Sequence, residues 1–155
     1  MSWDSFGYFA VVSMVLALAG APVALCRPNR TRTACWLTLG GIAALACFVA
    51  GFWVTLGRPP MRTMGETRLW YSLCVLIAGL LVYRRWRFRW VLLFTTVMAS
   101  VFCLVNLLKP EIHDATLVPA LQSVFFVPHV VAYMFAYGIL ACAFLLAVAG
   151  VADRR

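Results

Sequence analysis

The run CWLTLGGIAALACFVAGFWVTL, residues 35–56, contains no charged residue and is long enough to cross the hydrocarbon core of a bilayer as one helix. Further apolar runs lie at about 7–25, 66–83, 90–108 and 126–151. Because lipid offers the backbone no hydrogen-bond partners, such runs are expected to fold as helices. The sequence therefore predicts an all-α integral membrane protein of about five transmembrane helices, forming a single membrane domain over residues 1–155.

The composition agrees with this class, since 65% of the 155 residues are hydrophobic and only 12% are charged. Basic residues outnumber acidic ones, with 13 Lys and Arg against 5 Asp and Glu. Most of these charged residues lie in short loops between the apolar runs. There they set topology and meet anionic headgroups, so we expect membrane lipids, and no nucleic acid, as their partners. No Lys or Arg precedes the first run, so we expect that run to stay as a helix and not to be cleaved as a signal peptide.

The distribution of basic residues predicts the orientation. Nine of the 13 fall in the first loop, the third loop and the C-terminus. By the positive-inside rule, these segments are cytoplasmic, with the N-terminus outside and the C-terminus inside. The positions of the aromatic residues agree with this orientation, because they form two interfacial belts. The outer belt contains Trp53, Trp70 and Tyr71, and the inner belt contains Trp36, Trp86 and Trp90.

The polar loop GRPPMRTMGET, residues 57–67, contains a helix-start signal. Thr63 and Glu66 have capping-box spacing, in which the hydroxyl and the carboxylate each accept a backbone N–H. We therefore expect the third helix to begin near Met64, and we expect Glu66 to act chiefly through this cap.

Two features indicate contacts between helices. Gly40 with Ala44, and Ala46 with Ala50, are pairs of small residues four apart, which let helix backbones approach closely. Asn106 interrupts the fourth apolar run, and an amide in the hydrocarbon needs a partner. We expect it to form a hydrogen bond between helices.

The chain has two histidines, His113 and His129, and the predicted topology places both at the outer side. His129, Tyr133 and Tyr137 recur every four residues and share one helix face, which we expect to point into the bundle or toward a cofactor. His129 either ligates a metal or hydrogen-bonds a loop carbonyl at the interface. His113, in a polar loop, is expected to be solvated, with ligation as the alternative.

Several classes of chemistry are not indicated. The chain has no nucleophile motif, no phosphate loop and no paired intramembrane carboxylates, so a nucleotide-driven machine or a proton pump is not expected. It has no CxxCH, so covalent haem c is not expected either.

Two segments resemble the cytochrome c assembly protein family, of the CcsA, ResC and CcmC type. They are GRPPMRTMGETRLWYS (57–72) and LVPALQSVFFVPHVVAYMFAYG (117–138). In the family, a Pro-Ala-Leu-Gln-Ser stretch precedes a helix that opens with an external histidine. The resemblance implies that His129 is the first of two external axial ligands of haem iron.

The implied cargo is haem b, bound transiently and without a covalent bond. Neutral imidazole is a good haem-iron ligand. Our own addition to the family motif is that Arg58, Arg62 or Arg68 meets the haem propionates by charge-assisted hydrogen bonds, and that Tyr133 contacts haem.

Family members continue into a Trp-rich WWD segment and a second external histidine, and this sequence contains neither. We therefore expect a second assembly subunit, containing the WWD segment or of the ResB type, to supply them. The expected function is haem delivery to apocytochrome c at the outer face of the bacterial cytoplasmic (inner) membrane, by a binding subunit and not by a stand-alone enzyme. The alternatives are a structural membrane subunit and a non-functional fragment without a haem site.

Overall fold

The computed structural model describes residues 3–26, 30–61, 63–109 and 126–153, and all regular secondary structure in these ranges is helical. The helices are α1 (Trp3–Cys26), α2 (Thr31–Leu56), α3 (Met64–Trp86), α4 (Arg89–Leu108) and α5 (Phe126–Asp153). The predicted all-α class is therefore confirmed. Each predicted run lies inside one helix, but α1 and α2 begin earlier than predicted, because backbone hydrogen bonding continues into polar residues such as Thr31.

Four of the helices are long and apolar enough to cross a membrane: Ser5–Cys26 within α1, and the whole of α2, α3 and α4. In α5 the described residues give a shorter apolar helix, Pro128–Ala141. The chain is thus a multi-pass membrane protein by length and composition, while a fifth span and the orientation stay predictions.

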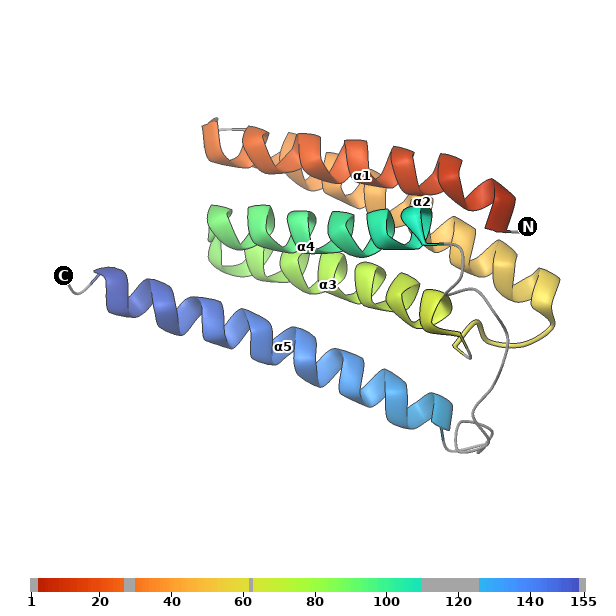
Figure 1. Ribbon diagram of the computed structural model, residues 1–155. Coiled ribbons are helices and arrows are strands. Elements are labelled where there is room, and N and C mark those ends of the chain that lie inside the picture. Colours follow the sequence, from red (N-terminus) through yellow and green to blue (C-terminus); the bar gives the residue numbers. More distant parts are fainter. Residues whose placement is uncertain (1–2, 27–29, 62, 110–125, 154–155) are drawn as a thin grey trace.

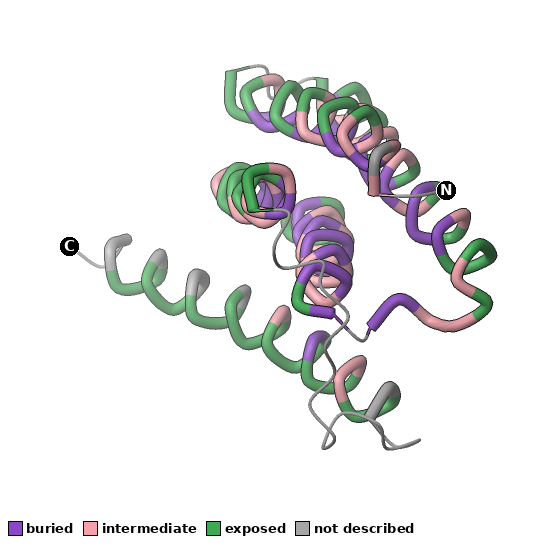
Figure 2. The backbone as a smooth tube through the Cα atoms, turned by 45° about the vertical axis from the view of Figure 1, so that its right-hand side comes forward, coloured by how far each residue is buried: buried purple, intermediate pink, exposed green. Residues whose placement is uncertain are grey.

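The first four helices form a bundle of two antiparallel pairs, α1 with α2 and α3 with α4, joined by contacts of α1 with α4 and of α2 with α3 (Figure 1). Helix α5 lies along the outside of this bundle against α3. Most of its described residues are exposed, whereas the bundle helices bury one side (Figure 2).

Aromatic rings and close backbone contacts fill the core between α1 and α2. Phe48 stacks on Phe52 with ring centroids 5.5 Å apart, and Phe6 lies 5.1 Å from Phe48. The α2 backbone approaches α1 closely at Gly41, where an added Cβ would lie 2.9 Å from the carbonyl oxygen of Ser13. Close packing was expected from small residues in this helix.

The predicted small-residue pairs lie beside the most buried stripe of α2. Gly40, Ala44 and Ala46 are half-buried, with Ala46 packed against the core, and Ala50 is exposed. The buried positions Thr38, Gly41, Leu45 and Phe48 define a stripe one residue away from the predicted one. Spacing alone does not select the stripe, because α2 is apolar on all sides.

The starts of α1, α3 and α5 and the ends of α2 and α4 meet at one end of the molecule, which we call the His129 end (Figure 1). The opposite end carries the junctions from α1 to α2 and from α3 to α4. The loop before α3 and the first turns of α5 therefore share one end, as the predicted topology requires.

A candidate haem site at the His129 end

The start of α3 is fixed by the predicted capping box. Thr63 Oγ1 accepts a hydrogen bond from the Glu66 N–H at 3.1 Å, and Glu66 Oε2 accepts one from the Thr63 N–H at 3.2 Å. The preceding helix, α2, ends at Gly57, whose φ of 61° suits a residue without a Cβ. The prediction that α3 begins near Met64 is confirmed.

Glu66 has a second role that the sequence analysis missed. Its two carboxylate oxygens accept hydrogen bonds from Nη1 and Nη2 of Arg58 at 3.1 and 3.0 Å, and Arg58 Nη1 also donates to the Pro59 carbonyl at 3.2 Å. Glu66 is 2% exposed, and the Arg58 side chain 26%. The predicted cap is confirmed, but the expectation that Glu66 acts chiefly through it is incomplete, because the same carboxylate also pairs with Arg58.

Two more hydrogen bonds fix this loop to the bundle. Trp70 Nε1 donates to the Pro60 carbonyl at 2.9 Å. The buried Asn106 donates from Nδ2 to the Gly65 carbonyl at 3.0 Å, which confirms the expected bond between helices. The end of α4 and the first turn of α3 are thereby held together next to the ion pair.

Arg68, one turn into α3, differs from Arg58 because part of its charge has no partner. Its Nη1 is buried and has no acceptor in the part of the chain that the structure describes. A buried N–H donor without an acceptor is costly, and a charged one more so. Arg68 is therefore the arginine best suited to receive an anionic group. Arg62, the third predicted arginine, lies outside the described residues.

His129, Tyr133 and Tyr137 form one continuous face of α5, as their spacing predicts. The His129 ring meets Tyr133 edge to face at 4.5 Å, and Tyr133 lies 5.7 Å from Tyr137. His129 is exposed, and Tyr133 and Tyr137 are 46% and 53% exposed. His129 and Tyr133 do not point into the bundle, since α5 buries Met134 instead, whereas Tyr137 lines a pocket shared with α3 and α4.

The depth of His129 follows from the register of α5 on α3. A Cβ added to Gly138 would lie 4.0 Å from that of Ala78, and the two helices run in the same direction (Figure 1). Because each helix rises equally per residue, counting back from this contact along both helices sets His129 at about the level of Leu69. The imidazole and the Arg68 guanidinium thus lie at similar depths on neighbouring helices.

Haem and a bare metal ion require different sets of side chains. The described residues contain no group of three or more His, Cys, Asp or Glu side chains that could hold an ion. Haem needs only an imidazole along its axis, because the porphyrin supplies the equatorial ligands. The exposed His129 and the unpartnered Nη1 of Arg68 match the iron and the propionates of that group. His113 lies outside the described residues.

The described residues place the chain in the class of multi-pass helical membrane proteins, with an exposed histidine at the start of α5. Residues 61–155 match the family described as Cytochrome C assembly protein, so the chain belongs to that family and to cytochrome c biogenesis. The matched segment contains α3, α4 and α5 with His129, and leaves out α1 and α2. No curated protein and no solved structure matches the chain.

Proposed function

We propose that this chain binds haem b without a covalent bond at its His129 end, at the outer face of the bacterial cytoplasmic membrane, for delivery to apocytochrome c. The observation that carries the proposal is the exposed His129, which lies on the first turns of α5 inside the segment that matches the family. The same proposal includes the orientation that the basic residues predict, with the N-terminus outside and the C-terminus inside.

In this proposal haem is the cargo, and the chain orients it. The neutral imidazole of His129 donates its lone pair to the haem iron. Tyr133, in edge-to-face contact with the imidazole, restricts the rotation of that ring. Arg68 donates to a haem propionate, which gives its buried Nη1 the acceptor that it lacks among the described residues.

The proposal assigns the second axial position to another protein. The partner is a second assembly subunit that carries a WWD segment and an external histidine, with or without a ResB-type subunit. The exposure of His129, Tyr133 and Tyr137 on α5 supports a partner that supplies the second ligand, because a second chain has room to pack against them.

The test is the haem content of the purified chain, expressed with its partner subunit. Wild type is expected to show a haem spectrum that His129→Ala loses, while the variant still inserts in the membrane. Added imidazole is expected to restore the spectrum of His129→Gly, and His113→Ala is expected to keep it. Equal haem in wild type and His129→Ala would refute the ligand assignment and favour a structural subunit.

The role of Arg68 needs a separate comparison. Arg68→Gln is expected to weaken haem binding about tenfold, the effect of losing one charge-assisted hydrogen bond. The same variant is expected to bind haem dimethyl ester, whose propionates are blocked, as well as wild type does. Arg85→Gln is the control, because it removes an exposed arginine from the other end of the same helix. An equal loss of binding with both forms of haem would exclude the propionate contact.

A further inference from the structure

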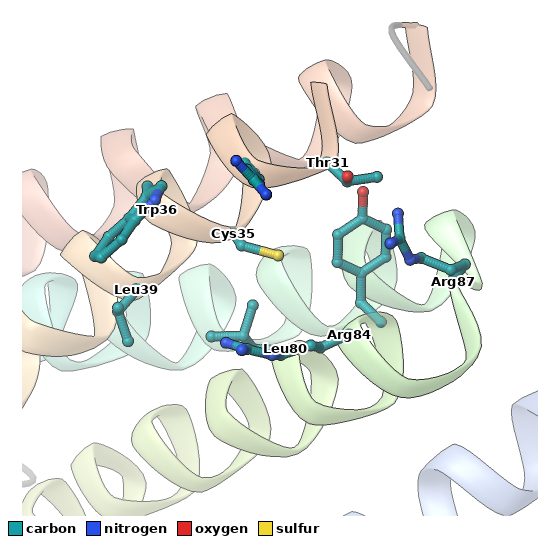
Figure 3. A pocket seen from close by; sticks show the side chains of 9 residues that line it. Thr31, Cys35, Trp36, Leu39, Leu80, Arg84 and Arg87 are labelled. Carbon is teal, nitrogen blue, oxygen red and sulfur yellow. The ribbon is translucent and has the colours of Figure 1, made fainter. Parts of the chain in front are cut away.

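A second polar feature lies at the opposite end of the molecule from His129. There the first turns of α2 and the last turns of α3 enclose a cleft of about 380 Å³ (Figure 3). Two helical stripes face each other across it, and each runs from basic residues at the end to apolar residues farther in. The α2 stripe contains Arg32, Trp36 and Leu39, and the α3 stripe contains Leu80, Arg84 and Arg87.

The three arginines leave the mouth of the cleft strongly positive. Arg32, Arg84 and Arg87 are exposed, and no carboxylate pairs with any of them within the ranges that the structure describes. Arg87 is held at the end of α3 in the left-handed conformation, with φ of 62°, and its N–H donates to the Tyr83 carbonyl at 2.9 Å. The charges thus come from two helices and converge on one opening.

Tyr83 supplies an independent sign of a missing ligand. It lines the cleft, its side chain is 1% exposed, and its buried hydroxyl has no hydrogen-bond partner among the described residues. An unsatisfied buried hydroxyl destabilises the fold. An oxygen of an anionic group in the cleft would accept a hydrogen bond from the Tyr83 hydroxyl. The arginines would neutralise the negative charge of that group.

The inner part of the cleft is apolar and open to the membrane. Trp36 is 70% exposed and Leu39 is 42% exposed, and both lie on α2, a helix apolar enough to span a bilayer. A free phosphate would leave these side chains unused. A ligand with an anionic head and an apolar chain would use both parts of the cleft.

We propose that this cleft binds the phosphate headgroup of an anionic phospholipid, with an acyl chain along Trp36 and Leu39. Basic pockets between transmembrane helices are suited to such headgroups. The inference does not rest on the haem proposal, because the cleft is at the other end of the molecule and its α2 wall lies outside residues 61–155.

The test is native mass spectrometry of the full chain in an uncharged detergent, with three ligands added in turn. They are dioleoyl phosphatidylglycerol, dioleoyl phosphatidylcholine and glycerol phosphate, which separate headgroup charge from the acyl chains. Phosphatidylglycerol is expected to bind about tenfold more tightly than either of the others. Over phosphatidylcholine the gain corresponds to one charge-assisted contact, and over glycerol phosphate it comes from the acyl chain buried along Trp36 and Leu39.

Matched variants then locate the site. Arg84→Gln with Arg87→Gln is expected to abolish the preference for phosphatidylglycerol. Arg30→Gln with Arg85→Gln removes the same charge from the same end of the molecule but not from the cleft, and is expected to keep the preference. Tyr83→Phe, which removes only the hydroxyl, is expected to weaken phosphatidylglycerol binding severalfold.

Three results would overturn the proposal. Equal loss in the two double variants would show nonspecific attraction by the basic end of the molecule. Glycerol phosphate that binds as tightly as the lipid would make this a site for a soluble phosphate. No preference for phosphatidylglycerol in the wild-type chain would exclude an anionic-lipid site.

Discussion

Arg58 and Glu66 form a bidentate ion pair across the loop between α2 and α3, with N–O distances of 3.1 and 3.0 Å. The same carboxylate accepts the Thr63 N–H, so one buried acid both caps α3 and closes the loop. The loop before α3 is therefore held at both of its ends, close to where the haem site is proposed.

Glu66→Gln separates the two roles of this carboxylate. Glutamine keeps the cap, since it serves equally in a capping box, but it removes the charge that neutralises Arg58. We expect a loss of about 1–2 kcal/mol in the free energy of unfolding, between the values for exposed and buried ion pairs. Thermal unfolding in detergent measures it, and the double variant Arg58→Gln, Glu66→Gln should recover part of the loss. If Glu66→Gln leaves the free energy of unfolding unchanged, the ion pair with Arg58 adds nothing to stability.

Thr63→Ala is expected to destabilise the start of α3 by about 1 kcal/mol, because the Glu66 N–H loses its acceptor. Hydrogen exchange of the first-turn amides measures this locally. Thr67→Ala is the matched control: Thr67 Oγ1 donates only to the Thr63 carbonyl, a bond that does not cap the helix. Equal effects of the two variants would contradict the capping role.

Gly79→Ala tests the close approach of α3 and α4. An added Cβ would lie 2.6 Å from Thr95 Cβ, so the two helices must separate. We expect a destabilisation of about 1–3 kcal/mol, typical of overpacking. At Gly150 on α5 no atom lies within 4 Å of an added Cβ, so Gly150→Ala should be neutral or slightly stabilising. If Gly79→Ala unfolds at the wild-type temperature, the packing of α3 on α4 is looser than described.

Reporter fusions test the predicted orientation. A fusion after Pro60 should give alkaline phosphatase activity, which requires export, and a fusion after Trp86 should give the fluorescence of a cytoplasmic reporter. The physical reason is the excess of basic residues at the first and third junctions and at the C-terminus. The reverse pattern would move His129 to the cytoplasmic end and would remove the outer-face haem site with it.

Local features of the site could be predicted because they depend on neighbours in sequence. The capping box of Thr63 and Glu66 needs only residues three apart, and the shared face of His129, Tyr133 and Tyr137 needs only the helical repeat. The direction of that face could not be predicted. It depends on whether Met134 or the tyrosines contact α3, and both sides of α5 are apolar enough to do so.

The sequence alone predicts the helices, because long apolar runs in lipid must satisfy their backbone hydrogen bonds internally. Local motifs predict the start of α3 and the family. The tertiary structure decided which arginine is paired and which is not. Arg58 and Arg68 look equivalent in the sequence, but the loop folds back so that Glu66 meets Arg58, and Arg68 Nη1 is buried without an acceptor among the described residues. The cleft at the opposite end likewise exists only because α2 packs beside α3. Its two walls are the first turns of α2 and the last turns of α3, which are separated in the sequence by most of both helices.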